Sequence, residues 1–525
     1  MAESETEEAR RRVVRSASAI TPLTLLSRVS GYARDKAFAH VLGASARMDA
    51  FLVAFRIPNM LRDIVGEGAM SSAFIPVYAG VQAERSDVEA RAFVGRALGT
   101  FTLILAVLTA LGVAASPFLV GLLAPAFRAR PWQFDLAVTL NRWIFPYILL
   151  VSIAAFFQAV LNSHHRFAVS AAAPVLLNLA MIGATLLVAP KLAEPTYGLA
   201  AGVLAGGLLQ AAVQWPELRR LGVVGRPALG WRDPAVRSVL TLMTPRLFAY
   251  GINTINLTFA TRFAAGLGTS SVSRLYFANR LKELVLGGFA VALATAILPL
   301  LSRQALSKDR TEFKATLAFA LRLIAFVTVP ATVGLIVLRE PIVRVLFQGG
   351  QYAAGDTAAT AAVLATLSIG LFFFALVRVV VPAFYALKDT RLPVLAAFAD
   401  MAVFLALGAF LSRRLGLPGI GLASSCAAAV NVSVLGAVLR SREGRLGGRA
   451  IAASLLRVTA ASAVMGAAVY GARRAIGLEG LPLLPAALAL AAIIAGASVV
   501  YWLAARLLGS PEPAELARLA RRKPA

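Results

Sequence analysis

The chain has 525 residues, of which 59% are hydrophobic and only 15% are charged, and Lys and Arg outnumber Asp and Glu by 52 to 26. Soluble domains average about 45–50% apolar and about 25% charged residues, so this composition excludes a soluble globular protein as well as a disordered chain. The basic residues interrupt long apolar stretches, as in the cytoplasmic loops of membrane proteins, which argues against a nucleic-acid-binding module. The composition therefore predicts a multi-pass membrane protein.

Residues 1–15 are first acidic and then basic, which predicts a cytoplasmic N-terminal tail and no cleavable signal peptide. Beyond this tail, windows of about 20 mostly apolar residues, the length that crosses a bilayer, predict about fourteen transmembrane helices. The predicted spans lie near 16–42, 48–80, 96–125, 136–162, 168–190, 198–216, 236–265, 272–302, 312–338, 357–387, 392–412, 420–439, 451–472 and 482–508. The first, second, seventh and eighth are the weakest by hydropathy because they contain charged residues.

Loop charge predicts the orientation of these spans, because Lys and Arg concentrate in cytoplasmic loops. With the N-terminus inside, the basic segments at 219–232, 303–314 and 440–449 all fall on the cytoplasmic side. An even number of spans then places both termini in the cytoplasm.

The sequence also contains an internal repeat. Pro22 recurs as Pro245 and Pro76 recurs as Pro299, in similar local motifs and at the same step of 223 positions. With six spans before and six after about residue 230, this spacing predicts an all-α polytopic protein with two homologous six-helix lobes of the same orientation. The predicted parts are the N-terminal tail 1–15, the lobes 16–230 and 231–445, the last two spans in 446–508, and the C-terminal cytoplasmic tail 509–525.

Charged residues inside spans are costly, by roughly 2.5–3.5 kcal/mol each on insertion scales, and they mark functional interiors. The densest set lies in the first two spans and comprises Arg28, Arg34, Asp35, Lys36, Asp49, Arg56, Arg62, Asp63 and Glu67. A second set lies where the second lobe begins and comprises Arg246, Arg262, Arg274, Arg280, Lys282 and Glu283. Because the two sets occupy corresponding places in the repeat, we expect them to face each other across a central cavity of net positive charge.

A cationic cavity without a catalytic acid pair predicts an anionic passenger. The planar guanidinium group suits pyrophosphate because it makes bidentate hydrogen bonds to phosphate oxygens. Arg34, Arg62 and Arg280 are the favoured functional cations, and Asp35 either orients Arg34 or binds a cation. For the basic residues near predicted span ends, snorkelling toward the interface is the favoured reading; these residues are Lys36, Arg56, Arg274 and Lys282.

Signatures of enzymes are missing from the sequence. The stretch 350–357 imitates a phosphate-binding loop, but Asp356 replaces the required lysine, which predicts an outer loop with Asp356 near a helix start. His164 and His165 are typical of a solvated turn rather than a metal site. Cys426 is the single cysteine, which excludes a disulfide framework and a cysteine-ligated zinc site. The sequence therefore predicts a transporter, with no catalytic residue, metal or cofactor.

The stretch SRVSGYARD at residues 27–35 is similar to the first-helix signature of the MurJ (MviN) family, the lipid II flippases of bacterial cell-wall synthesis. The similarity continues in segments 48–51, 54–59, 67–69, 145–150, 276–281, 346–350 and 382–390. It covers most of the chain and fades in the last two spans. The combination of motifs is specific, although each motif alone is not.

The resemblance implies a fourteen-helix transporter of the multidrug/oligosaccharidyl-lipid/polysaccharide (MOP) exporter superfamily in the bacterial cytoplasmic (inner) membrane. It implies that the last two helices form a groove for the polyprenyl tail of lipid II. It also implies which residues bind the headgroup of that lipid, namely Arg28, Arg34, Arg62 and Arg280, with Asp35 and Asp49 beside them. Asp63 and Asn279 depart from the family pattern, which often has a basic residue and an aspartate at these positions.

The implied partners are lipid II and membrane lipids, without nucleic acid. Coupling to the membrane potential or to an ion, and contact with the machinery of cell-wall elongation or division, stay open at this point. Two other functions also stay open. An exporter of another polyprenyl-linked saccharide fits the same features, whereas a MATE-like exporter of cationic drugs should have an acidic cavity. A membrane enzyme acting on polyprenyl phosphates would need a larger loop domain than the predicted loops of about 15–20 residues.

Overall fold

The computed structural model describes residues 22, 23, 25–64, 70–307 and 309–521. Regular structure within these residues is helical, which confirms the predicted fold class. The chain divides into two compact units, Met1–Val272 with Gly349–Tyr352, and Ser273–Gln348 with Ala353–Ala525. The predicted N-terminal tail 1–15 and the motif at 67–69 lie outside the described residues.

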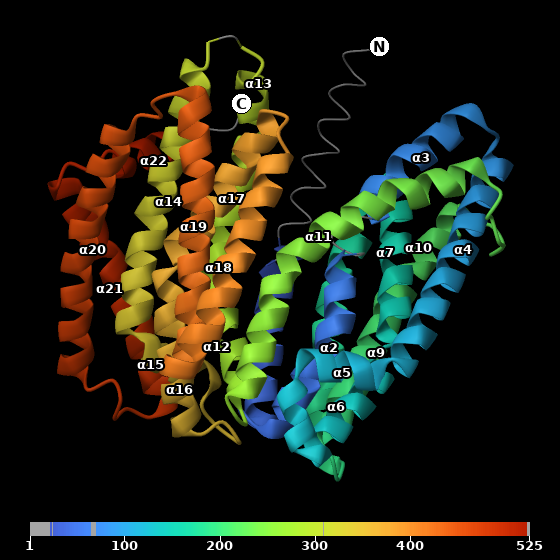
Figure 1. Ribbon diagram of the computed structural model, residues 1–525, viewed down its shortest axis with the longest axis horizontal. Helices are drawn as coiled ribbons and strands as arrows, with labels where there is room; N and C mark the ends of the chain where they lie inside the picture. The colour runs from blue at the N-terminus through green and yellow to red at the C-terminus, as the bar shows by residue number, and fades with distance from the viewer. Residues whose placement is uncertain (1–21, 24, 65–69, 308, 522–525) are drawn as a thin grey trace. The chain divides into compact units, whose positions relative to one another are not determined.

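The first unit begins with a helix at residues 25–42. Its further helices are α2 (Ala46–Ile64), α3 (Met70–Glu84), α4 (Asp87–Ala114), α5 (Ser116–Leu123), α6 (Pro131–Ile144), α7 (Tyr147–Ser163), α8 (Phe167–Gly183), α9 (Thr196–Ala212), α10 (Trp215–Leu221) and α11 (Pro234–Gly266) (Figure 1). Aromatic side chains from α3, α4 and α7 form an apolar core, in which Phe74, Phe93 and Phe156 are almost completely buried. Helix α3 packs along α7, and α2 packs along α6.

An extended connection, residues 222–233, ties the start of α11 to α4. The amide of Gly225 donates to the carbonyl of Arg91 at 3.1 Å, and Arg96 pairs with Asp233 at 2.7 Å. Gly95 lets the two backbones approach, since a Cβ there would lie 2.4 Å from a carbonyl oxygen of the connection. These contacts, with the packing of α11 on α3 and α2, explain why α11 belongs to the first compact unit. The lobe boundary at 230 rests on the repeat rather than on contacts, and it stays a prediction.

A tight turn at Gly349–Tyr352 packs on the end of the helix at 25–42. The amide of Gln351 donates to the carbonyl of His40 at 2.9 Å. Gly350 adopts a left-handed conformation, with φ of 58°, and a Cβ there would lie 2.2 Å from the same carbonyl oxygen. Glycine is therefore required at this position, where both the backbone angle and the space exclude a side chain.

The second unit is also a helical bundle (Figure 1). Its helices are α12 (Ser271–Val285), α13 (Val291–Gln304), α14 (Thr311–Val337), α15 (Arg339–Phe347), α16 (Ala354–Ile369), α17 (Leu371–Ala386), α18 (Arg391–Leu415), α19 (Leu417–Glu443), α20 (Gly448–Ile476), α21 (Leu483–Leu507) and α22 (Glu512–Arg521). Helices α13, α14, α17 and α19 enclose one apolar core. A second apolar cluster joins α14 to α20 and α21.

Ten helices of the described residues are long and apolar enough to cross a membrane. An eleventh candidate is the pair α16 and α17, which bends by 44° at a short break. The predicted spans 16–42, 48–80 and 236–265 are not among these candidates. They carry many of the charges that lower hydropathy, and parts of the first two lie outside the described residues. The polytopic fold is thus confirmed, whereas the count of fourteen is not.

Candidate functional site

The charged motif of the first helix contains a buried network around Arg34. Its Nε and Nη2 atoms donate to Oδ1 of Asp35 at 3.1 and 2.8 Å, and its Nη1 atom donates to Oδ1 of Asn178 at 3.1 Å. The Arg34 side chain is 11% exposed and that of Asp35 is fully buried. The guanidinium also lies 5.6 Å from the ring centroid of Phe38. In this structure Asp35 therefore orients Arg34, which is one of the two roles expected for it.

Asn178 on α8 joins this network to the backbone of the first helix. Its Nδ2 atom donates to the carbonyl of Ser27 at 3.1 Å and to Oγ of Ser30 at 3.0 Å. The network thus bridges elements that are 144 residues apart in the chain. Sequence reasoning missed Asn178 because a single uncharged polar residue in an apolar span is a weak signal.

Asp49 and Arg62 lie at opposite ends of α2. Asp49 is fully buried in the first turn, where Ser45 caps the helix by accepting from the amide of Met48 at 3.2 Å. Arg62 is partly exposed in the last turn. Each charge matches the helix dipole at its end. Thirteen residues of helix separate them by about 20 Å, so the two do not form one contact site.

Arg28 is exposed on the helix at 25–42, and Arg280 is partly exposed on α12. Five of the six proposed site residues belong to the first unit, and Arg280 belongs to the second. The central cavity between the two charged sets stays a prediction. The side chains of Asp63, Glu67 and Arg246 lie outside the described residues.

Two charged residues of the predicted sets hold α11 within the first unit. Arg56 on α2 donates from Nη2 to Oγ1 of Thr261 at 3.0 Å. Arg262 donates from Nη1 to the carbonyl of Leu122 at 2.6 Å. Their partners are an uncharged hydroxyl and a backbone carbonyl, so the contacts position helices of the unit.

Arg274, Lys282 and Glu283 of the second charged set are paired within the second unit. Arg274 donates from Nε and Nη2 to Oδ1 of Asp356 at 3.1 and 2.8 Å. The ammonium of Lys282 lies 4.5 Å from the ring centroid of Phe374 and 3.8 Å from the carboxylate of Glu283. These partners hold Arg274 and Lys282 inside the unit.

Asn279, a departure from the family pattern, donates to the carbonyl of Leu275 in its own helix at 3.1 Å. Asp356 lies in the first turn of α16, where its Oδ2 atom accepts from the amide of Ala353 at 3.2 Å. This confirms the predicted helix start. The stretch that imitates a phosphate-binding loop therefore presents a paired carboxylate rather than a cation.

His164 ends α7 in a turn, and its Nε2 atom lies 3.0 Å from the hydroxyl of Tyr78. Burial, with the nearby His165, lowers the pKa of His164, so the ring is neutral at neutral pH. Within the described part of the chain, no group of three or more His, Cys, Asp and Glu residues is placed to hold a metal.

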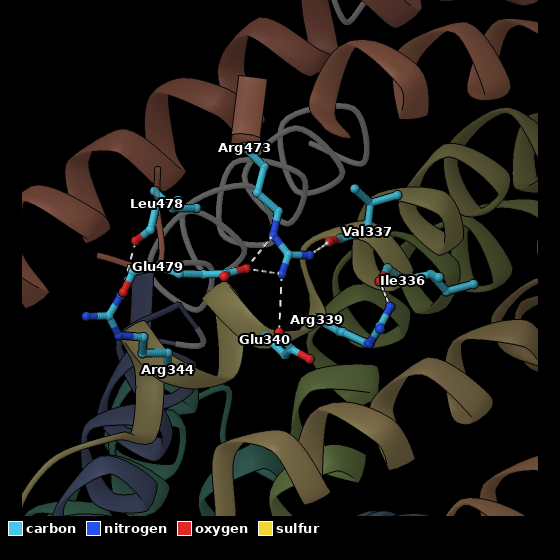
Figure 2. Close-up of polar contacts among 8 residues, drawn as sticks. All are labelled: Ile336, Val337, Arg339, Glu340, Arg344, Arg473, Leu478 and Glu479. Carbon is cyan, nitrogen blue, oxygen red and sulfur yellow. Dashed lines mark hydrogen bonds and ion pairs between the residues drawn. The ribbon is translucent and has the colours of Figure 1, made fainter. Parts of the chain in front are cut away.

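A second polar cluster, which sequence reasoning also missed, holds the turn between α20 and α21 (Figure 2). Arg473 in the last turn of α20 donates to the carbonyl of Val337 at 2.6 Å, to Glu340 at 3.2 Å and to Glu479 at 3.1 Å. Its hydrogen bond and charge hold the pKa of Glu479 below the usual value. The cluster lies where α14 and α20 end and α15 begins, which makes it a candidate structural site.

Arg344 on α15 completes this cluster, which we call the turn clamp (Arg344, Arg473, Glu340 and Glu479). Its Nη1 atom donates to the carbonyls of Leu478 and Glu479 at 3.1 and 2.7 Å (Figure 2). Its Nη2 atom donates to the carbonyl of Leu481 at 2.7 Å. A cavity of about 320 Å³ adjoins the clamp. Arg344, which lines this cavity, binds backbone carbonyls, so its role there is to hold the turn.

Comparison with known proteins adds a family to this geometry. A family model described as "Lipid II flippase MurJ" matches residues 38–504. The probable lipid II flippase MurJ of Vibrio cholerae is 37% identical over 433 residues, which cover 81% of this chain and 82% of that protein. The lipid II flippase MurJ of Burkholderia cenocepacia is 36% identical over 427 residues, which cover 81% of this chain and 83% of that protein.

Solved structures agree with these sequence matches. A structure titled lipid II flippase MurJ, inward closed conformation, is 26% identical with a TM-score of 0.74, covering 92% of this chain and 98% of that chain. An inward-facing multidrug resistance transporter of the MATE family in the MOP superfamily shares the fold at 12% identity, with a TM-score of 0.65. That match covers 82% of this chain and 99% of the transporter.

Proposed function

The chain belongs to the family of lipid II flippases named MurJ, and we propose that it moves lipid II from the inner to the outer leaflet by alternating access. It is a multi-pass protein of the bacterial inner membrane and a transporter rather than an enzyme. Both termini lie in the cytoplasm under the orientation that loop charge favours. The outward step supplies precursor to cell-wall synthesis, whose elongation and division machinery we expect as neighbours.

The headgroup pyrophosphate binds, in this proposal, to the cations that match the family motifs, which are Arg28, Arg34, Arg62 and Arg280. Asp35 pairs with Arg34, and Asp49, buried at the other end of α2 from Arg62, offsets positive charge in the first unit. The observation that carries this assignment is the buried pair of Arg34 and Asp35, whose side chains are 11% and 0% exposed. A guanidinium held in place by a neighbouring carboxylate is oriented before the substrate arrives, which reduces the entropy lost on binding.

Arg34 must exchange one acceptor for another when it binds the headgroup. A phosphate oxygen is a charge-assisted acceptor comparable to the Oδ1 atom of Asp35, and the contacts of the headgroup must offset the cost of separating the buried carboxylate from Arg34. The headgroup is released at the outer leaflet when the guanidinium of Arg34 pairs with Asp35 again. The same pair thus serves capture and release without a chemical step.

The membrane potential or an ion gradient supplies the free energy in this proposal. An inside-negative membrane potential favours outward movement of negative charge. Each net negative charge that moves outward releases about 2.3 kcal/mol per 100 mV. An ATP-binding site is therefore unnecessary for net transport of an anionic lipid.

The test is the exposure of lipid II on the outer face of cells depleted of this protein, read with a membrane-impermeant probe of the headgroup. We expect depletion to remove surface lipid II, the parent chain to restore it, and Arg280→Ala to fail at a normal protein level. Arg303→Ala, which changes an exposed arginine on α13, is the matched control and should restore exposure. Unchanged exposure on depletion would instead favour another polyprenyl-linked saccharide as the passenger.

A further inference from the structure

The two helices that lie outside the predicted repeat, α20 and α21, form a C-terminal hairpin that packs along α14. The shared surface is apolar and includes the buried side chains of Phe326, Val458 and Met465. The helices approach closely at Gly466, where a Cβ would lie 2.6 Å from Cγ1 of Val333. An apolar surface alone does not fix one helix on another in a bilayer, because lipid tails are as apolar as the side chains. The attachment therefore depends on close packing, as at Gly466, and on polar contacts between the helices.

The turn clamp supplies such contacts at one end of the hairpin. Arg344 and Arg473 connect the α20–α21 turn to α14 and α15 through backbone carbonyls and two glutamates. These hydrogen bonds join the α20–α21 hairpin to α14 and α15. The hairpin therefore cannot slide along α14 without breaking several of them.

A second set of contacts holds the other end, in a segment predicted to be a cytoplasmic tail. Glu512, the first residue of α22, is 1% exposed. Its carboxylate accepts from Oγ of Ser454 on α20 at 2.6 Å and from Oγ of Ser510. Arg322 on α14 lies 3.5 Å from the same carboxylate and donates to Glu515 at 3.1 Å.

We call this set the tail anchor (Arg322, Ser454, Ser510, Glu512 and Glu515). It joins α14, α20 and α22 through one buried carboxylate, and Leu516 packs on the apolar cluster beside it. Arg322 and Val337, which mark the anchor and the clamp on α14, are fifteen residues apart, or about 22 Å along the helix. The hairpin is therefore held by polar contacts at two points that are most of a bilayer thickness apart.

We propose that the C-terminal hairpin and residues 510–516 are fixed to α14 at both ends and move with the second unit as one rigid body. Glu512 locks the tail end, because it is the carboxylate that α14, α20 and the C-terminal segment share. Residues 510–516 then belong to the rigid body of the second unit rather than to a solvated tail. This proposal goes beyond the transported substrate and does not depend on its identity.

The test is a distance measurement between spin labels on α14 and α20 in the full-length protein in lipid. Ala315→Cys and Ala453→Cys place labels at exposed positions near the tail end, in a Cys426→Ser background. We expect one narrow distance distribution, unchanged by addition of lipid II. Glu512→Ala should add a second population by releasing α20 from α14.

The matched control is Arg457→Ala, which removes an exposed charge on α20 three residues from Ser454 and should leave the distribution unchanged. Ser454→Ala removes one hydrogen bond while Glu512 keeps its contacts with Arg322 and Ser510, so it tests the anchor if Glu512→Ala fails to fold. Two populations in the parent protein would overturn the proposal. So would a narrow distribution that persists in both Glu512→Ala and Ser454→Ala.

Discussion

Arg34 in the first unit and Arg344 in the second are both partly buried arginines, but different groups accept their hydrogen bonds. Arg34 donates to the side chains of Asp35 and Asn178. Arg344 donates to three backbone carbonyls of the α20–α21 turn. A carboxylate can be replaced by a phosphate oxygen, whereas a carbonyl of a turn can be released only by opening the turn.

The chemistry of the partner therefore separates arginines that bind a passenger from arginines that hold the fold. Arg262, which donates to the carbonyl of Leu122, follows the pattern of Arg344. Counting charges inside spans does not make this distinction, because both kinds of arginine interrupt an apolar stretch in the same way. Arg34→Ala and Arg344→Ala test this difference directly. Gly350→Ala and Glu479→Gln have smaller expected effects and test contacts that hold turns.

Arg34→Ala should abolish the support of growth in cells depleted of the protein, when it is compared with the parent at matched protein levels. A hydrogen bond that involves a charged group is worth about 1.5–3 kcal/mol, so each lost bond to the headgroup weakens binding roughly 10- to 150-fold. Arg34→Lys should restore growth only in part, because an ammonium cannot make the bidentate contact. Growth that is normal with Arg34→Ala would remove this residue from the site.

Arg344→Ala should lower the melting temperature of the purified protein and leave substrate affinity unchanged. Three carbonyls of the turn lose their donor, and we expect a destabilisation of about 2 kcal/mol. Arg339→Ala is the matched control on the same helix, because Arg339 donates only within its own turn to Ile336 in the bonds described. Equal melting temperatures for the two variants would contradict the clamp.

Gly350→Ala should destabilise the turn that packs on the helix at 25–42. The left-handed backbone costs a residue with a Cβ about 1–2 kcal/mol, and the contact with the carbonyl of His40 adds to this cost. Gly355→Ala, at a position with open space and no left-handed angle, should have little effect. Hydrogen exchange at the amide of Gln351 measures the difference, and equal protection in both variants would argue against the packed turn.

Acidification should weaken the turn clamp slightly. Because the folded-state pKa of Glu479 is lowered, its contribution is present above the unfolded value and is lost as pH falls through the folded value. The melting temperature of the parent should therefore fall more than that of Glu479→Gln between neutral pH and pH about 3. The effect is small because the Glu479 side chain is 65% exposed. An identical pH dependence in the two proteins would exclude this carboxylate as its source.

Composition and local pattern were sufficient to predict the helical membrane fold, the start of α16 at Asp356 and the motif around Arg34. Each of these depends on residues that are close in sequence. The partners of Arg34 and Arg473 could not be predicted in the same way. Asn178 is 144 residues from Arg34, and Glu340 is 133 residues from Arg473. The hydropathy of a span does not predict which residue of another helix will bind its polar side chains.

The C-terminal segment shows a second limit of sequence reasoning. Residues 509–525 are polar and basic, which predicts a solvated tail, yet Glu512 is buried against α14 and α20. The burial depends on a serine and an arginine in two distant helices that together satisfy the carboxylate. Only the tertiary arrangement brings these three groups together.

The most direct test is the affinity of the purified protein for lipid II, measured for Arg34→Ala and Arg344→Ala side by side with their melting temperatures. We predict that Arg34→Ala loses affinity at least about tenfold, because one charge-assisted bond is worth that much, and that it also melts earlier, because the buried Asp35 loses its cation. Arg344→Ala should melt earlier and bind lipid II like the parent. Loss of affinity in Arg344→Ala with normal binding by Arg34→Ala would contradict the account.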